Sequence, residues 1–284
     1  MRKPPKSKAS WQESGLTAYL PLRFGANRAS AISIMPTRLF HISDLHFGAQ
    51  DNAALDKVAN AIASETPDLV VCTGDLTQRA KRSEFEAAEN WFASIEVPVV
   101  MEPGNHDMPY YNMFERLFDP FRRFKRLHRA TAEQSFENDD CIILPLRTAV
   151  PFQPRFPWVD GLVTRSALAA TVKRLEDLKN DPRLKLVTGH HPLLGPETKP
   201  GNPTIAGESA FAALAGAGAH AMLTGHVHVP FDRLRQVGRR SMRMIGAGTL
   251  STRLRHGAPP SYQVITCDGP SIVSELRTLP NPET

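Results

Sequence analysis

Five short apolar runs in this chain each lead into a polar cluster that contains Asp, Asn or His, and this recurring pattern restricts the fold more than any other feature. The clusters are Asp44-Leu45-His46, Gly74-Asp75, Gly104-Asn105-His106-Asp107, Gly189-His190-His191-Pro192 and Gly225-His226-Val227-His228. Any one of them alone would be an ordinary polar turn after a strand. Five together indicate that these side chains meet at one edge of a sheet.

The clusters lie within a repeated pattern of strand, loop and helix. Apolar runs predict strands at 38–42, 69–73, 97–101, 141–146, 185–188 and 221–224. Amphipathic segments predict helices at about 51–64, 83–94 and 166–180, the first capped by Asp51 or Asn52 and the second opened by a capping box at Ser83-Glu84-Phe85-Glu86. Such alternation is typical of a parallel α/β sheet, whose ligands bind at the carboxyl ends of the strands.

The C-terminal part alternates as β structure. Strand-like segments at 233–235, 242–246, 262–267 and 272–276 predict an antiparallel run that closes a second sheet. The loop at 148–162 is long enough to cover a site, and a second long loop follows at 193–207. Because no linker interrupts the pattern, we expect residues 35–284 to form a single domain.

The first 34 residues differ from the rest. They are rich in Pro, Ser, Ala and Gly without a sustained helical or strand period, which predicts a disordered N-terminal tail at 1–34. The alternative is a misassigned start, because Met35 leads directly into the first strand. A targeting peptide fits less well, since the apolar part of the segment is short.

The net positive charge of the chain lies entirely in residues 1–34. Of the 34 bases and 29 acids, six bases and one acid lie in residues 1–34, which leaves 28 of each for the rest. A neutral body argues against nucleic acid as the partner. Three cysteines, an odd number with Cys72 inside a strand-like run, favour a reducing compartment and hence the cytoplasm. No apolar run approaches the ~18 residues of a membrane span.

The clusters contain a donor set typical of transition metals. The candidate ligands are two Asp, one Asn and four His, without a thiolate: Asp44, Asp75, Asn105, His46, His190, His226 and His228. Such oxygen and imidazole donors suit Mn, Fe, Co or Zn. In an extended chain, residues two apart point the same way, so Asp44 and His46 are expected to chelate one ion, and His226 and His228 share this spacing.

The five clusters, in this order, resemble the motifs of the calcineurin-like metallophosphoesterase superfamily, most closely its bacterial cyclic-nucleotide-phosphodiesterase-like (class III) branch. The resemblance runs from Asp44 to His228 and into the C-terminal β segment. It implies an α/β (α+β) fold in four layers, αββα: a two-sheet β-sandwich flanked by helices. It also implies a dinuclear metal centre at one edge of the sheets.

Specific roles follow from the resemblance. It assigns the first metal to Asp44, His46, Asp75 and His228, and the second to Asp75, Asn105, His190 and His226. Asp75 would bridge the two ions together with a water or hydroxide that attacks the phosphorus. His106 would lie beside the metals, oriented by Asp107, and would stabilise charge or protonate the leaving group. Manganese, iron or both are expected, with zinc or cobalt as alternatives.

At three positions the chain differs from the residues typical of other subfamilies of this superfamily, so those three subfamilies fit poorly. Purple acid phosphatases place a tyrosinate where this chain has Gln78, and protein Ser/Thr phosphatases place Glu where it has Asp107. Lipid A pyrophosphatases place Arg at the position of His106. The remaining histidines, His41, His128, His220 and His256, are interpreted as structural, and His191 is interpreted as a neighbour of the site at most.

Several activities stay compatible with this pattern. We expect a phosphodiesterase acting on a small organic phosphate, a cyclic nucleotide or a glycerophosphodiester. The alternatives are a nuclease with a basic groove at 122–129 and 233–243, a phosphomonoesterase, and, least favoured because every ligand is present, a non-catalytic scaffold. Tyr110, Tyr111, Arg147 and residues 200–207 are expected to set specificity. The sequence leaves a homodimer open.

Overall fold

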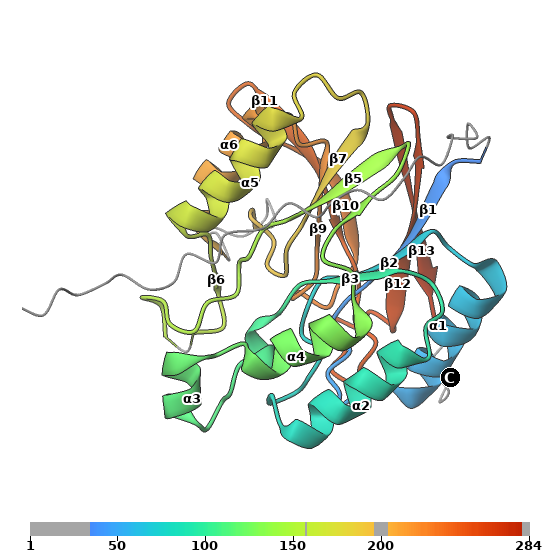
Figure 1. The fold of residues 1–284 in the computed structure, drawn as a ribbon, viewed down its shortest axis with the longest axis vertical. Coiled ribbons are helices and arrows are strands. Elements are labelled where there is room, and N and C mark those ends of the chain that lie inside the picture. Colours follow the sequence, from blue (N-terminus) through green and yellow to red (C-terminus); the bar gives the residue numbers. More distant parts are fainter. Residues whose placement is uncertain (1–34, 157, 196–203, 280–284) are drawn as a thin grey trace, which may run out of the picture. The chain divides into compact units, whose positions relative to one another are not determined.

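Two β-sheets packed face to face form the centre of the structure, and helices cover their outer faces (Figure 1). The computed structural model describes residues 35–156, 158–195 and 204–279. These residues belong to the second of the two units into which the chain divides, Met1–Ser33 and Ile34–Thr284. The tail expected at 1–34 lies outside the described residues.

The first sheet has five strands in the order β13-β12-β1-β2-β3. Its parallel part comprises β1 (Thr37–Ile42), β2 (Leu69–Cys72) and β3 (Val99–Met101). On the other side of β1, β12 (Ser261–Asp268) pairs antiparallel, and β13 (Ser271–Thr278) forms the edge.

The second sheet has six strands in the order β10-β11-β9-β7-β5-β4. Its four central strands are parallel and its two edge strands are antiparallel. In sheet order the bounds are Phe231–Val237, Arg240–Gly246, Ala221–Thr224, Leu184–Thr188, Cys141–Pro145 and Phe136–Glu137. A separate short pair joins β6 (Gly161–Leu162) to β8 (Thr204–Ile205).

The apolar residues divide into three separate cores, as expected for four layers. Along β1, Leu39 points between the sheets and belongs to the same cluster as Ile143 of β5 and Leu223 of β9. Phe40 and Ile42 point the opposite way, toward the helices. Since successive side chains of a strand alternate between its faces, each sheet is buried on both sides. The predicted αββα sandwich is therefore confirmed.

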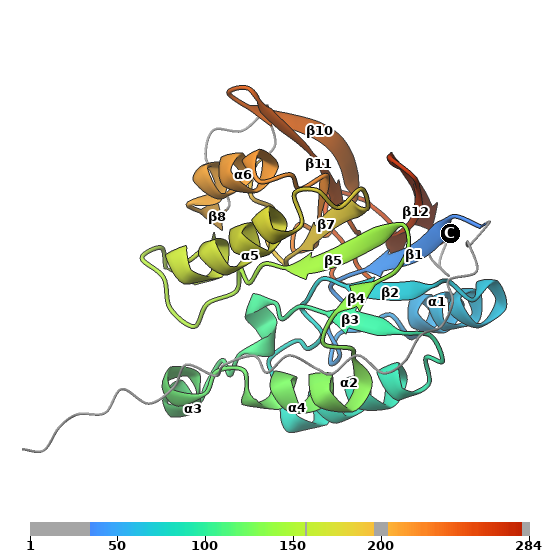
Figure 2. The ribbon, with the colours of Figure 1, turned by 45° about the horizontal axis from the view of Figure 1, so that its top comes forward.

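The helices lie in two layers (Figure 2). The five-stranded sheet is covered by α1 (Asn52–Glu65), α2 (Arg82–Ala93) and α4 (Arg122–Thr131). The six-stranded sheet is covered by α5 (Arg165–Asp177) and α6 (Gly207–Gly216). The short α3 (Met113–Phe118) precedes α4, and η1 (Asn105–Asp107) is a single turn after β3. None of the described helices combines the length and apolar character needed to cross a bilayer.

The helix starts agree only in part with the sequence analysis. Asp51 caps α1 as predicted, because its carboxylate accepts a hydrogen bond from the Ala54 amide at 3.0 Å. The capping box expected at Ser83 and Glu86 is wrong, since α2 begins after Lys81. The carboxylate that caps the start of α2 belongs instead to the buried Glu84. It accepts hydrogen bonds from the amides of Lys81 and Arg79 and so closes the turn before the helix.

The prediction that the last four strands form one run in a second sheet is also wrong. β10 and β11 belong to the six-stranded sheet, whereas β12 and β13 belong to the five-stranded sheet. The cause is the pairing of β12 with β1 from Thr37 to His41, which draws the chain from one sheet to the other through residues 247–260. This crossing segment passes beside the site described next.

Candidate metal centre

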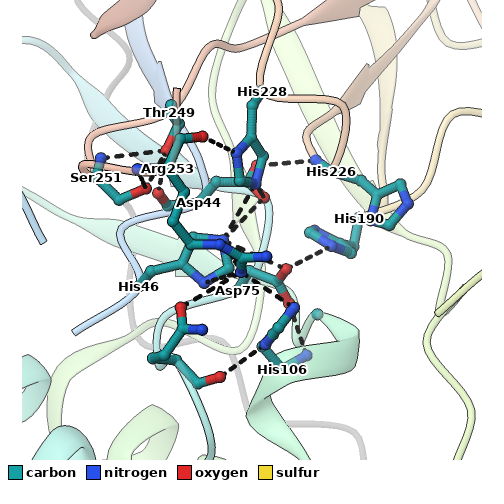
Figure 3. A network of polar contacts seen from close by, with 12 residues as sticks. Asp44, His46, Asp75, His106, His190, His226, His228, Thr249, Ser251 and Arg253 are labelled. Carbon is teal, nitrogen blue, oxygen red and sulfur yellow. Dashed lines mark hydrogen bonds and ion pairs between the residues drawn. The ribbon is translucent and has the colours of Figure 1, made fainter. Parts of the chain in front are cut away.

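The loops that follow β1, β2, β3, β7 and β9 meet at one edge of the two sheets and bring the candidate ligands together (Figure 3). His46 Nε2 lies 3.1 Å from His228 Nε2 and 3.7 Å from the nearest oxygens of Asp44 and Asp75. His190 Nε2 lies 3.3 Å from Asp75 Oδ2. Except for His226 and Asn105, which are slightly accessible, these side chains are almost completely buried.

The potential ligand atoms form overlapping groups rather than one cluster. Asp44, His46 and His228 form one group, whose donor atoms lie within 4.8 Å of one another, and His190, His191 and His226 form another. Asp75 belongs to two further groups, one with His46 and His106 and one with Asp44 and His190. The arrangement therefore has two halves that share Asp75.

Unused donor atoms favour metal ions at this place. Asn105 Oδ1 and His190 Nε2 are buried and have no hydrogen-bond partner among the described residues. Buried polar atoms are normally satisfied, so an oxygen and a nitrogen of two proposed ligands without hydrogen-bond partners suggest a bound cation. Carboxylate, amide and imidazole donors without sulfur fit Mn, Fe, Zn or Co.

The ligand-bearing loops adopt strained backbone conformations. Ten described residues other than glycine have a positive φ, and five of them are Asp44, His46, Asp75, His226 and His228. A left-handed conformation costs a residue with a side chain about 1–3 kcal/mol and persists where the surroundings impose it. Asp44 and His46 thus converge through consecutive tight turns and not, as predicted, through an extended chain.

The same convergence explains two of the glycines. A Cβ atom on Gly104 would lie 2.1 Å from Asp75 Oδ1, and one on Gly225 would lie 1.8 Å from Ser43 Oγ and 2.5 Å from Asp44 Oδ2. Neither position has room for a side chain. Glycine at these positions allows the loops after β3 and β9 to approach the carboxylates closely.

Backbone carbonyls orient two of the imidazoles. His190 Nδ1 donates to the carbonyl of Thr73 at 2.7 Å, and His228 Nδ1 donates to the carbonyl of Arg253 at 2.6 Å. In both cases Nε2 is left free to face the centre. This outer hydrogen bond is the usual support of a metal-binding histidine.

The carboxylates make the centre strongly negative. Burial opposes ionisation, yet the hydrogen bonds and charges of neighbouring histidines keep the pKa of Asp44 well below its usual value, and the pKa of Asp75 is also lowered. Burial lowers the pKa of His190, but Asp75 and Asp44 outweigh it and raise that pKa to about 9. Such a potential attracts cations.

His106 lies beside the two halves and is partly exposed. Its Nδ1 donates to the carbonyl of Gln78 at 2.7 Å, so Nε2 faces the centre, and its amide donates to Asp75 Oδ1 at 2.8 Å. The resemblance implied that Asp107 orients this ring, but the carboxylate of Asp107 accepts from the amides of Leu76, Thr77 and Gly104 instead. Asp107 thereby ties the loop after β2 to the loop after β3.

Of the other histidines, only His191 adjoins the centre among the described residues, because it belongs to the donor group of His190 and His226. Both ring nitrogens of His191 are engaged, Nδ1 with the Thr148 hydroxyl and Nε2 with the Val159 carbonyl, each at 3.0 Å. His41 is buried, with Nε2 on the hydroxyl of Thr73. None of the potential metal-binding groups among the described residues contains His41, His128, His220 or His256.

The residues expected to set specificity are dispersed. Tyr111 is exposed, and its hydroxyl accepts from Arg79 Nη1 at 3.1 Å; Tyr110 packs edge-on against its ring. The guanidinium of Arg147 lies over the ring of Phe121 at 5.0 Å. Residues 200–203 of the predicted second loop lie outside the described residues.

Sequence analysis missed Arg253, which reaches the centre from the crossing segment between β11 and β12. The segment reads Ala-Gly-Thr-Leu-Ser-Thr-Arg from Ala247 to Arg253. A Gly-, Ser- and Thr-rich stretch directly after a strand was a signal for a loop at this sheet edge. The pairing that turns it toward the centre was not predictable from the local sequence.

Comparison with known sequences agrees with this geometry. The calcineurin-like phosphoesterase family matches over residues 37–230. A UDP-2,3-diacylglucosamine pyrophosphatase of Chlamydia trachomatis serovar D is 38% identical over 77 residues, covering 26% of this chain and 23% of that protein. A glycerophosphodiester phosphodiesterase of Enterobacter lignolyticus is 32% identical over 81 residues, covering 24% of this chain and 29% of that protein. The matched region is thus less than a third of either relative.

Solved structures show the same fold at low sequence identity. A purple acid phosphatase of yellow lupin superposes with a TM-score of 0.63 at 14% identity, over 86% of this chain and 51% of that chain. A dimetal phosphatase of Danio rerio superposes with a TM-score of 0.62 at 13% identity, over 86% of this chain and 96% of that chain.

Proposed function

Because the chain belongs to the calcineurin-like phosphoesterase family, we propose that it is a metal-dependent hydrolase whose substrates are small organic phosphodiesters. The observation that carries the proposal is the pair of overlapping donor groups that share Asp75. Relatives named as a glycerophosphodiester phosphodiesterase and as a probable cyclic nucleotide phosphodiesterase support the diester class.

Two metal ions fit the donor set. Asp44, His46 and His228 would hold the first, Asn105, His190 and His226 would hold the second, and Asp75 would serve both. A bound pair of ions, manganese, iron or both, would lower the pKa of a water between them and withdraw electron density from the phosphoryl oxygens. The buried carboxylates supply the negative charge that retains these cations.

The side chain of His106 provides the proton chemistry. Since Nδ1–H donates to the Gln78 carbonyl, Nε2 is the nitrogen that faces the substrate. In its cationic form this nitrogen donates a proton to the leaving alkoxide, or a hydrogen bond to a phosphoryl oxygen. The partial exposure of His106 keeps it in contact with solvent for reprotonation.

Other features agree with a small substrate in a reducing compartment. The part of the chain after residue 34 has equal numbers of acids and bases, which gives no net attraction for a nucleic acid. Cys72, Cys141 and Cys267 are buried and form no disulfide among the described residues. We place the protein in the cytoplasm and treat residues 35–284 as one domain.

The test is hydrolysis by metal-stripped protein reloaded with Mn²⁺. Bis(p-nitrophenyl) phosphate is expected to be cleaved faster than p-nitrophenyl phosphate, and His228→Ala is expected to abolish both activities. His256→Ala, an exposed histidine outside the centre, is the matched control and should retain them. Cleavage of the monoester alone would change the class to phosphomonoesterase. No cleavage by protein shown to hold two ions would overturn the proposal.

A further inference from the structure

The guanidinium of Arg253 lies beside His46 and His106 of the centre (Figure 3). Its Nη1 is 3.2 Å from Nε2 of His106 and 3.4 Å from both ring nitrogens of His46. It also donates to Gln78 Oε1 at 3.3 Å. Gln78 therefore holds two groups at once, His106 through its carbonyl and Arg253 through its side chain.

Arg253 differs from Arg123, Arg183 and Arg243 in what it faces. The guanidiniums of Arg123, Arg183 and Arg243 each pair with a carboxylate within 2.8 Å. Among the described residues, no carboxylate forms an ion pair with Arg253, although the side chain is half-buried. A guanidinium that rests against two imidazoles and an amide lacks the anion that such a group binds.

The carboxylates that attract Arg253, those of Asp75 and Asp44, are proposed to bind the metal ions. Burial lowers the pKa of Arg253, while the attraction of Asp75 and Asp44 raises it. Both carboxylates are proposed metal ligands, so cations would neutralise them in the working site. The anion for Arg253 would then come from outside the chain.

The backbone holds this side chain in place before any ligand arrives. The carbonyl of Arg253 accepts from His228 Nδ1 at 2.6 Å, and its amide donates to Ser251 Oγ at 3.3 Å. Ser251 Oγ lies 2.7 Å from Thr249 Oγ1, which donates to the carbonyl of Asp44 at 2.7 Å. Residues 249–253 are thus anchored to the loop that carries two of the proposed ligands, and the guanidinium is preorganised.

We propose that Arg253 binds the phosphoryl oxygens of the substrate and supplies positive charge to the site, beside His106 and His46. The assignment rests on the proposed function, because it takes a phosphoester as the missing anion. A guanidinium presents parallel N–H groups that match two phosphoryl oxygens, which an ammonium does not. Arg253 is therefore a substrate-binding residue, and its carbonyl separately positions His228.

The test compares two substitutions that each remove one positive charge, Arg253→Met and Arg255→Met. Arg255 is exposed, lies two residues away and forms no hydrogen bond with the centre among the described residues; its charge acts on Arg253 only at a distance, so it reports on the general field. The probe is inorganic phosphate, titrated calorimetrically into Mn²⁺-loaded protein whose metal content has been measured. kcat and KM for bis(p-nitrophenyl) phosphate are determined in parallel.

Arg253→Met is expected to weaken phosphate binding about 10- to 100-fold, the loss typical of a hydrogen bond to a charged group, with its metal content unchanged. Arg255→Met should stay within about twofold of the parent. Arg253→Lys should recover only part of the loss, and added guanidinium chloride should restore activity to Arg253→Ala, which a misfolded variant would not show.

Equal phosphate affinity in Arg253→Met and the parent, or equal losses in both Met variants, would overturn the assignment. A parent protein that binds two ions and phosphate but cleaves no ester would contradict the proposed function and leave the binding role of Arg253 measurable. The two proposals therefore fail in different experiments.

Discussion

The two sheets contribute different chemistry to the same site. Loops after the five-stranded sheet supply both carboxylates and the amide, Asp44, Asp75 and Asn105. Loops after the six-stranded sheet supply only imidazoles, His190, His226 and His228. Both carboxylates come from the five-stranded sheet, which also supplies His46, and the other imidazoles come from the six-stranded sheet, so the site is complete only when both sheets are in place. The comparison indicates that the centre also joins the two sheets.

The largest effect is expected at Asp75, the one proposed ligand that serves both halves. Asp75→Asn keeps the size of the side chain but removes the charge shared between the halves, so both ions should be lost and kcat/KM should fall at least about 10³-fold. Metal analysis and steady-state kinetics measure this. Asp56→Asn, on the exposed side of α1, is the control. An Asp75→Asn variant that still holds two ions would contradict the claim that Asp75 serves both halves of the centre.

Removal of metal should loosen the link between the sheets. An ion at 100 times its dissociation constant stabilises the folded state by about 2.7 kcal/mol, and a domain of this size shifts its Tm by about 2–4 °C per kcal/mol. Chelation with EDTA removes two such ions and is therefore expected to lower the Tm of the parent by about 10–20 °C, measured by scanning calorimetry. The same treatment should leave Asp75→Asn almost unchanged. Equal shifts in the two proteins would disconnect metal binding from the stability of the sandwich.

A second contact between the sheets depends on pH. Thr188 Oγ1 of β7 donates to Oε1 of Glu102, which follows β3, at 3.1 Å. Burial raises the pKa of Glu102 to about 7. The folded state binds the proton of Glu102 more tightly than the unfolded state. The contribution of protonated Glu102 to the free energy of unfolding is therefore full below the unfolded pKa and is lost as the pH rises through 7. The loss is about 3 kcal/mol at most.

Glu102→Gln tests that contribution. The variant should remove most of the decline in unfolding free energy between pH 5 and pH 8, as measured by urea denaturation at several pH values. A decline as steep as in the parent would show that another group causes it.

The smallest effect on stability is expected from a surface ion pair that links the end of α1 to two strands of the five-stranded sheet. Glu65 pairs with Arg277 of β13 and with Arg38 of β1, and all three side chains are partly exposed. The hydrogen bond with Arg277 leads the interactions that lower the pKa of Glu65. Glu65→Gln should cost less than about 1 kcal/mol at pH 7, and this cost should shrink as the pH falls through the lowered pKa of Glu65 and the parent loses the same charge. A cost that does not shrink in acid would point to packing instead of charge.

The sequence allowed the strands and the meeting of the clusters to be predicted, because apolar period and strand-end position are local signals, whereas the four layers were implied by the resemblance to the family. It did not reveal that β12 joins β1, since that pairing depends on residues more than 200 positions apart. The left-handed turns at Asp44 and His46 were also missed, because the strain is imposed by the packed loops and not by the residues themselves. Arg253 was missed for the same reason, as a nonlocal contact.

Anomalous diffraction from crystals of the Mn²⁺-loaded protein tests the central claim most directly. The account predicts two manganese peaks per chain, roughly 3.5–4 Å apart. One should lie among Asp44, His46 and His228, the other among Asn105, His190 and His226, with Asp75 between them. A single peak, or two peaks without contact to Asp75, would contradict a centre whose halves are joined by that carboxylate.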